Sequence, residues 1–370
     1  MRVLSVFGTR PEAVKMAPVI SRLACTPGIE SLVCVTAQHR QMLDQVLNLF
    51  NIRPDVDLDL MQPNQSLAEI SAAILRGLDP VLSNLKPDWV LIQGDTTTVM
   101  TTALLAYYHR IRVGHVEAGL RTYDKWQPFP EEINRRVAGV VADLHFAPTE
   151  WARQNLLREG VPAAAIAVTG NPVIDALQTV AAQPPPEETT RLLERLKIGE
   201  QRLVLVTAHR RENFGQPLEN ICLALRDLAG RGDIEIVYPV HLNPHVQEPV
   251  YRLLAETPHI TLLPPLDYLP LIHLMKHAYL VLTDSGGIQE EAPAFGVPVL
   301  VLRAITERPE GVQAGTLKLV GTKRGDVVEQ TARLLDNPQT YAEMARAVNP
   351  FGDGHAAEKI VNALLQFCKA

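Results

Sequence analysis

Short runs of apolar, mostly β-branched residues alternate with longer segments of helical periodicity along the whole chain. The expected strands are 2–7, 31–36, 89–93, 111–116, 143–147, 165–169, 202–207, 234–240, 259–263, 279–283, 297–302 and 317–320. Most of these runs are continuously apolar, which is typical of strands covered on both faces. The expected helices include 11–24, 66–84, 97–108, 149–158, 217–229, 246–256 and 325–335. Repeated strand–helix units predict parallel sheets wound by helices on both faces, an α/β fold.

Two segments interrupt this alternation. Gln183–Glu187 contains three consecutive prolines, which form a stiff, extended connector and place a domain junction near 172–187. Asn349–Gly354 breaks the chain again, before a last helical pattern. A chain of 370 residues also exceeds one comfortable core. The sequence therefore predicts two doubly wound domains, the first over 1–172 and the second over 173–353.

Composition and charge exclude several classes of protein. Apolar residues make up 46% and charged residues 21% of the chain, which is typical of a globular protein. The net charge is −6 and no basic stripe is visible, so no nucleic-acid partner is expected. No apolar run approaches the roughly 20 residues of a membrane span, and the first strand begins at once, without a signal peptide. The four cysteines have no paired spacing, and free thiols favour a cytoplasmic location.

Two strand-to-helix turns lie at matching places in the two halves, Val6–Glu12 and Thr283–Glu291. A strand that stops at Gly and feeds a helix points backbone N–H groups and the positive helix end at one spot, which favours a phosphate. In the first turn, Arg10 and Lys15 add two cations. An ordinary turn with solvated charges explains the first turn equally well. Two such turns together predict one diphosphate-bearing ligand held between two domains.

The second turn is the more specific of the two. Asp284 or Ser285 can cap the helix, and the pair Gly286 and Gly287 lets a ligand approach the backbone closely. Glu291 lies about one helical turn further, where a carboxylate can accept hydrogen bonds from ribose hydroxyls. The alternative is a well-capped helix with acidic residues in its first turn. The pattern favours a nucleotide ligand.

Three carboxylates are predicted at one edge of the first sheet. Asp95 follows the strand 89–93, Glu117 follows the strand 111–116, and Glu131 opens a helix after a proline-rich approach. Ligands of parallel sheets bind beyond the carboxyl ends of the strands. Converging carboxylates raise each other's pKa and make proton transfer possible near neutral pH. Helix capping by Asp95 and a plain first-turn acid at Glu131 are the alternatives.

The second half carries His209 at the position that corresponds to the Arg10 turn. This histidine can donate to a phosphate or act as an acid, although a lone loop histidine is usually a surface group. The alternating acids of 55–59 resemble a metal-binding motif but fit a half-exposed sheet edge better, so no metal site is expected. No G-x-G-x-x-G follows the first strand, which argues against a dinucleotide cofactor and a hydride-shuttling epimerase.

With these segments assembled, the chain closely resembles the non-hydrolysing UDP-N-acetylglucosamine 2-epimerases, nearly from end to end. The matching segments are Phe7–Ala13, Thr36–Arg40, Gly94–Thr98, Gly114–Arg121, Pro130–Arg135, His209–Asn213, Pro239–Pro244, Asp284–Glu291 and Thr306–Glu310. The resemblance implies the glycosyltransferase-B fold, in which two Rossmann-like doubly wound domains face a central cleft. It also implies that the last helix, within 354–370, returns to the first domain, and that the second domain binds UDP.

The implied reaction is the reversible epimerisation of UDP-N-acetylglucosamine to UDP-N-acetylmannosamine at C2. UDP is eliminated to give a bound 2-acetamidoglucal and is then added back, without a cofactor. The resemblance further implies a cytoplasmic homodimer that serves cell-surface polysaccharide biosynthesis. The alternatives are a hydrolysing 2-epimerase, a UDP-sugar glycosyltransferase and a non-enzymatic nucleotide-sugar sensor. Hydrolysing relatives usually carry a fused kinase, for which 370 residues leave no room. A transferase or a sensor makes no use of three clustered carboxylates.

The resemblance also assigns residues. The catalytic groups are Asp95, Glu117, Glu131 and His209. The diphosphate contacts are Arg10, Ser285, Gly286 and Gly287, assisted by Lys15 and Arg308, and the ribose anchor is Glu291. Backbone around Leu266 and Leu271 meets the uracil; family members carry Gln and Phe there, so stacking by an aromatic ring is excluded at Leu271. A second, activating UDP-N-acetylglucosamine is assigned to Gln38, Gln41, Arg210 and His241.

Overall fold

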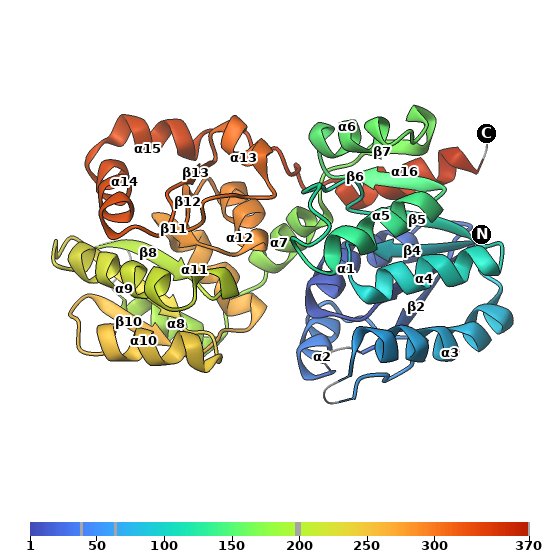
Figure 1. Ribbon diagram of the computed structural model, residues 1–370, viewed down its shortest axis with the longest axis horizontal. Coiled ribbons are helices and arrows are strands. Elements are labelled where there is room, and N and C mark those ends of the chain that lie inside the picture. Colours follow the sequence, from blue (N-terminus) through green and yellow to red (C-terminus); the bar gives the residue numbers. More distant parts are fainter. Residues whose placement is uncertain (38–39, 63–64, 197–200, 369–370) are drawn as a thin grey trace. The chain divides into compact units, whose positions relative to one another are not determined.

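The computed structural model describes residues 1–37, 40–62, 65–196 and 201–368 (Figure 1). The chain forms two compact units, Met1–Ala176 with Phe351–Ala370, and Leu177–Pro350. It passes from the first unit to the second after Ala176 and returns after Pro350. The boundaries expected from the sequence, 172/173 and 353/354, lie a few residues from these crossings.

The first unit contains a parallel seven-stranded sheet in the order β3-β2-β1-β4-β5-β6-β7. Its strands are β1 (Arg2–Phe7), β2 (Glu30–Val35), β3 (Val56–Asp57), β4 (Trp89–Gln93), β5 (Arg112–Val116), β6 (Leu144–Ala147) and β7 (Ile166–Val168). The six longer strands match the expected ranges within one or two residues, because most of them are buried apolar runs; β7, at the other edge of the sheet, is only partly buried. The short β3 forms one edge of the sheet, as the alternating acids of 55–59 predict.

Helices connect these strands. They are α1 (Arg10–Ala24), α2 (Arg40–Leu49), α3 (Leu67–Leu85), α4 (Thr97–Tyr108), α5 (Glu131–Val141), α6 (Glu150–Arg158), the 3₁₀ turn η1 (Ala163–Ala165), α7 (Pro172–Ala181) and α16 (Ala356–Phe367). In Figure 1, α16 (red) lies with the blue and green elements of the first unit. Asp175 of α7 accepts hydrogen bonds from the N–H groups of Ala356 and Ala357, at 3.1 and 2.9 Å, and so caps α16.

The second unit contains a parallel six-stranded sheet in the order β10-β9-β8-β11-β12-β13. Its strands are β8 (Arg202–Thr207), β9 (Ile234–Pro239), β10 (Ile260–Leu263), β11 (Leu280–Thr283), β12 (Val299–Val301) and β13 (Leu317–Leu319). Its helices are α8 (Glu187–Arg195), η2 (Arg211–Asn213), α9 (Gln216–Ala229), α10 (Pro244–Leu254), α11 (Tyr268–His277), α12 (Gly286–Glu291), η3 (Ala292–Phe295), α13 (Pro309–Ala314), α14 (Arg324–Asp336) and α15 (Pro338–Ala345).

Two parallel sheets with interleaved helices confirm the predicted pair of doubly wound, Rossmann-like units. Each sheet is buried against its helices; Trp89 and Phe7 in the first unit and Tyr238 in the second are among the largest fully buried side chains. The boundary between Ala176 and Leu177 lies within the range 172–187 expected for the junction, and α7 occupies Pro172–Ala181, ahead of the three prolines. Within the described residues, no helix is both long and apolar enough to cross a membrane.

Candidate active site

Glu117 is a buried carboxylate at the carboxyl end of β5, and it accepts hydrogen bonds from three other elements. Lys15 Nζ of α1 lies 2.6 Å from one carboxylate oxygen and 2.7 Å from the other. Asn171, just before α7, donates its side-chain amide to Oε1 at 3.0 Å, and Gln93 at the end of β4 donates to Oε2. Burying both partners of an ion pair demands this kind of geometry, because each charge must be compensated locally.

The backbone of Glu117 is strained at the same point. Its φ is +64°, in the left-handed region that side chains with a Cβ rarely adopt. Gly94, the residue after β4, also has a positive φ of +82°. A Cβ on this glycine would lie 3.6 Å from Glu117 Oε2. Strain of this kind persists where the surroundings over-determine the conformation, and it is common at functional sites.

Asp95 follows β4 and is joined to α5. Arg135 Nη2 lies 2.5 Å from Asp95 Oδ2, and the side-chain amide of Asn134 donates to the Asp95 carbonyl at 2.9 Å. Glu131 is the first residue of α5, the same helix whose Asn134 and Arg135 contact Asp95. Asp95 and Glu117 follow neighbouring strands, because β4 and β5 pair directly. Their convergence with Glu131 on one substrate stays a prediction.

Glu132, next to Glu131, has a structural role. Its fully buried carboxylate accepts hydrogen bonds from the N–H groups of Thr122 and Tyr123, at 3.0 and 3.2 Å. It also lies 3.4 Å from Arg135 Nη1. Glu132 therefore holds the loop that follows β5 against α5.

The first predicted phosphate turn uses its own backbone donors. Glu12 is buried and accepts from the N–H groups of Gly8 and Thr9, at 3.0 and 2.7 Å, in a capping box. It also accepts from Thr96 Oγ1 at 2.6 Å. Burial raises the pKa of Glu12. An ordinary, self-capped turn thus explains this turn's backbone, while Arg10, at the start of α1, has no carboxylate within 4.0 Å among the described residues.

The second predicted turn begins with Asp284, which anchors a neighbouring loop rather than capping α12. Asp284 is fully buried, and its Oδ2 accepts from the N–H groups of His209 and Arg210, at 2.9 and 2.8 Å, and from the Asn213 amide at 2.9 Å. The His209 ring stacks on His241 with centroids 5.3 Å apart. Two of the residues assigned to the activating UDP-N-acetylglucosamine therefore lie next to His209: His241 stacks on its ring, and Arg210 follows it in the chain.

Gly286 lies directly against the guanidinium of Arg308. A Cβ at Gly286 would lie 2.6 Å from Arg308 Nη1, so no larger residue fits without moving the arginine. Arg308 Nε lies 2.5 Å from Glu290 Oε1, and Nη1 lies 3.4 Å from Glu307 Oε2. Burial favours the neutral form of Glu307, but Arg308 and Arg303 outweigh it and lower the pKa of Glu307 to about 2.

The remaining predicted residues are spread over both units. Glu291 is buried at the end of α12 and accepts from the Tyr268 hydroxyl at 3.0 Å. Leu266 precedes α11, and Leu271 lies within it, both half-buried. Gln38 lies outside the described residues; Gln41 lies in α2, and its side chain is outside the described part.

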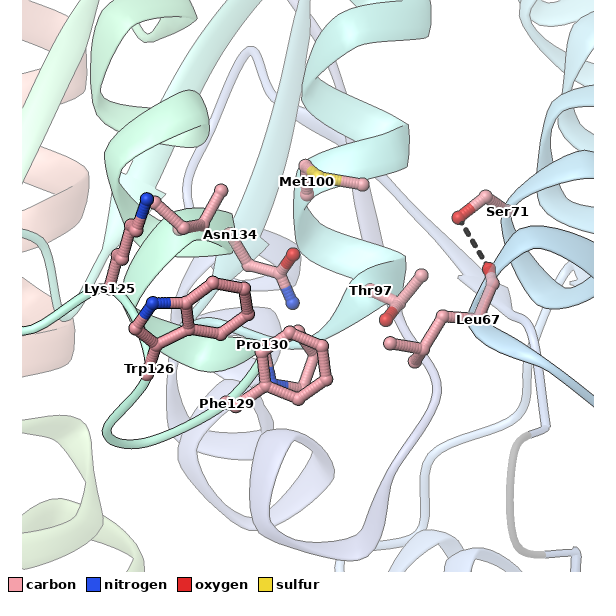
Figure 2. A pocket seen from close by; sticks show the side chains of 10 residues that line it. Leu67, Ser71, Thr97, Met100, Lys125, Trp126, Phe129, Pro130 and Asn134 are labelled. Atoms are coloured by element: carbon pink, nitrogen blue, oxygen red, sulfur yellow. Dashed lines mark hydrogen bonds between the residues drawn. The ribbon is translucent and has the colours of Figure 1, made fainter.

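An apolar pocket of about 330 Å³ lies beside α5, in the first unit. Figure 2 shows the rings of Trp126 and Phe129 on one side and Leu67 and Ser71 of α3 on the other. The two rings stack at 5.9 Å and are more than half exposed. The pocket reaches Asn134, but none of the predicted carboxylates lines it. Within the described part of the chain, no cluster of His, Cys, Asp or Glu could hold a metal ion.

Several polar side chains around the predicted carboxylates do not stand out as site residues in the sequence. They are Gln93, Asn134, Arg135, Asn171 and Tyr268. Two signals point to some of them. Gln93 is the polar last residue of an apolar strand, and Asn134 and Arg135 lie three and four positions after Glu131, on the same helix face.

Comparison with known proteins identifies the family. The profile of the family described as UDP-N-acetylglucosamine 2-epimerase matches residues 21–365. The UDP-N-acetylglucosamine 2-epimerase of Escherichia coli (strain K12) is 56% identical over 371 residues, which cover 98% of both chains. Among solved structures, the Neisseria meningitidis UDP-GlcNAc 2-epimerase bound to UDP-GlcNAc has a TM-score of 0.91 at 48% identity, covering 99% of this chain and 100% of that one. S. aureus MnaA with UDP has a TM-score of 0.91 at 46% identity, covering 100% and 97%. The chain therefore belongs to the UDP-N-acetylglucosamine 2-epimerase family.

Proposed function

We propose that this protein interconverts UDP-N-acetylglucosamine and UDP-N-acetylmannosamine by reversible elimination and re-addition of UDP, without hydrolysing the substrate. The observation that carries the proposal is the buried Glu117–Lys15 pair, which lies at the carboxyl end of β5, beside the strand that leads to Asp95. This arrangement supplies strongly positioned carboxylates for proton transfer, in a family named for epimerisation at C2.

The sugar's C2 proton is hard to remove because no carbonyl group lies next to it. Departure of UDP makes it acidic: the C1–O bond breaks, its electron pair leaves with the β-phosphate oxygen, and positive charge develops at C1. A carboxylate then takes the C2 proton, and the C–H electron pair forms the C1=C2 bond of 2-acetamidoglucal. In the return step, C2 is protonated on the opposite face while a UDP oxygen attacks C1. The electrons and the proton balance without a redox partner.

The first unit supplies the carboxylates. Lys15 provides positive charge beside Glu117, and Arg135 provides it beside Asp95. An anionic carboxylate can accept the C2 proton or stabilise the charge at C1. Which of Asp95, Glu117 and Glu131 is the C2 base stays open. Two carboxylates on opposite faces of the sugar are needed, because proton removal and proton return occur from different sides.

The second unit supplies most of the contacts to UDP. The proposed diphosphate contacts are Arg10, Ser285, Gly286 and Gly287, with Arg308 assisting, while Lys15 pairs with Glu117. Glu291 accepts from ribose hydroxyls, backbone near Leu266 and Leu271 meets the uracil, and His209 assists departure of UDP. Support comes from the relatives, since the N. meningitidis structure contains UDP-GlcNAc and the S. aureus structure contains UDP. Firm retention of UDP separates epimerisation from hydrolysis, because the bound intermediate must meet the same UDP again.

The test is incubation with UDP-N-acetylglucosamine in heavy water, followed by NMR at C2. Solvent deuterium at C2 of both UDP-sugars, with UDP still attached, is the expected result. Accumulation of free UDP and free N-acetylmannosamine would instead establish the hydrolysing reaction. An unchanged substrate, with hydrogen retained at C2, would leave a nucleotide-sugar sensor or a transferase.

We also propose a second UDP-N-acetylglucosamine site at Arg210 and His241. The cytoplasmic location stays a prediction.

We further propose that the protein is a homodimer. The exposed rings of Trp126 and Phe129 support a dimer interface, because exposed apolar patches of this kind mark association surfaces. Light scattering should give the mass of two chains, and Trp126→Ser should lower it. Tyr251→Ser, at an exposed tyrosine of α10, is the control. An unchanged dimer in Trp126→Ser would place the interface elsewhere.

A further inference from the structure

Asn171 lies where the chain leaves the last strand of the first sheet and enters α7, and its side chain serves two elements. Its Oδ1 accepts from the N–H of Val173 at 3.2 Å, which caps the start of α7. Its Nδ2 donates to Glu117 Oε1 at 3.0 Å. Asn171 is 1% exposed, so both contacts are made inside the protein. One side-chain amide therefore joins the carboxylate of Glu117 to the helix that leads out of the first unit.

The backbone of Asn171 joins a third segment. Its N–H donates to the carbonyl of Phe351 at 2.6 Å, and Phe351 is the first residue after the chain returns from the second unit. The two segments pack through glycines: a Cβ on Gly170 would lie 3.2 Å from the Gly352 Cα. Both glycines have positive φ, +84° and +140°. Only glycine allows this close approach at little steric cost.

We propose that Asn171 is a positioning residue for the epimerisation: it sets the orientation of the Glu117 carboxylate and makes that orientation depend on how the two crossing segments pack. The inference rests on the proposed function, because it acts through Glu117. Lys15 compensates the charge of Glu117 but reaches both oxygens at nearly equal distance, 2.6 and 2.7 Å. The amide of Asn171 reaches Oε1 and the amide of Gln93 reaches Oε2, so the two amides distinguish the oxygens and fix the plane of the carboxylate.

The consequence is a change in turnover without a matching change in binding. Small displacements of a reacting group reduce rates by up to about 100-fold, whereas UDP is proposed to be held mainly by the other unit. Asn171→Ser is the decisive variant. Serine retains a hydroxyl that can cap α7, but it is too short to reach Glu117. We expect kcat to fall on the order of 10- to 100-fold, with KM and the Kd for UDP within about threefold.

Gly352→Ala tests whether the packing of the two crossing segments affects turnover. A Cβ at Gly352 would lie 3.4 Å from the backbone nitrogen of Asn171, and the backbone of Gly352 has φ +140°. Its kcat should fall as well, and the double variant Asn171→Ser with Gly352→Ala should lose no more than the worse single variant. Gly160→Ala is the control, because Gly160 is another positive-φ glycine of this unit with nothing within 4 Å. Turnover is expressed per UDP-binding site, so partial unfolding does not imitate the effect.

Glu117→Gln separates the two proposals. If Glu117→Gln keeps full turnover, the catalytic role of Glu117 fails, and the proposal for Asn171 fails with it. If Glu117→Gln is inactive but Asn171→Ser retains kcat within twofold, only the positioning role is overturned. If the losses in the double variant multiply, Asn171 does not transmit the packing of the crossing to Glu117, which overturns the coupling.

Discussion

Lys15 Nζ lies 2.6 and 2.7 Å from the two carboxylate oxygens of Glu117, a residue 102 positions later in the chain. The pair joins the helix after β1 to the loop after β5, and both side chains are largely buried. A cation that the sequence assigns to a diphosphate therefore lies on a carboxylate in this structure.

Removing this cation should affect stability and turnover together. Lys15→Met leaves a buried carboxylate without its ion partner, so we expect the free energy of unfolding to fall by about 3 kcal/mol. Turnover should fall as well, while the affinity for UDP stays close to that of the wild type. Urea unfolding, turnover and calorimetric UDP titration measure the three quantities. Adding Glu117→Gln should restore most of the stability but no turnover. A large loss of UDP affinity in Lys15→Met would place Lys15 on the diphosphate instead.

Asp95→Asn should abolish turnover and leave UDP binding largely intact. The substitution preserves the shape of the side chain but removes the charge that pairs with Arg135. Loss of an acid–base group reduces rates on the order of 10²- to 10⁴-fold. The measurements are the rate of deuterium incorporation at C2 and the Kd for UDP. Asp79→Asn, at an exposed aspartate paired with His109, is the control and should retain full activity. Unchanged turnover in Asp95→Asn would remove Asp95 from the mechanism.

Gly286→Ala should weaken UDP binding by about tenfold, the effect of roughly 1.4 kcal/mol. The new methyl group would lie 2.6 Å from Arg308 Nη1, and Glu290 and Glu307 hold that guanidinium in place. The arginine must therefore move away from the turn. Gly325→Ala in α14 is the matched control, because nothing lies within 4 Å of its Cβ position. That control should keep the UDP affinity and gain a little helix stability. Equal affinities in the two variants would contradict a binding role for the Gly286 turn.

Acid should destabilise the first unit through two buried histidines. Burial lowers the pKa of His115 and of His145 to about 4, below the value of about 6.5 for an unfolded chain. The unfolded state therefore binds protons first, and stability falls as the pH drops from about 6.5 towards 4. Between pH 7 and pH 5, each histidine should remove about 2 kcal/mol from the free energy of unfolding.

Tryptophan fluorescence reports this loss, because Trp89, Trp126 and Trp151, the three tryptophans of the chain, all lie in the first unit. Urea unfolding at pH 7 and pH 5 should give a smaller difference for His145→Gln than for the wild type. His355→Gln, at a largely exposed histidine, should behave like the wild type. If His145→Gln and the wild type lose the same stability, His145 is not a source of the acid sensitivity.

The strands could be predicted from the sequence because each carries its own signal. A parallel strand buried on both faces is an unbroken apolar run, as in 89–93 and 202–207, and its register follows from the fold. Helix α7 is harder to predict from the sequence, because the three prolines that follow it indicate an irregular segment. A proline-rich segment marks an interruption but not the residue at which the preceding helix ends.

The sequence predicts those residues of the candidate site that directly follow a strand. Asp95 and Glu117 follow recognisable strands, so their place at the sheet edge follows from topology. Their partners could not be predicted, because the contacts between Lys15 and Glu117 and between Asn171 and Glu117 join residues 102 and 54 positions apart. Asp284 illustrates the same limit: an acid before a helix suggests a cap, but its oxygens accept from a loop 74 and 75 positions earlier.

The return of the chain to the first unit also fixes an order of events during synthesis. Residues 351–370 leave the ribosome after the whole of 177–350, and they include α16, whose first N–H groups are capped by Asp175. Domains generally fold as units while the chain emerges. The strands of both sheets have therefore emerged before α16 does, and the first unit must wait for its final helix to cover α1.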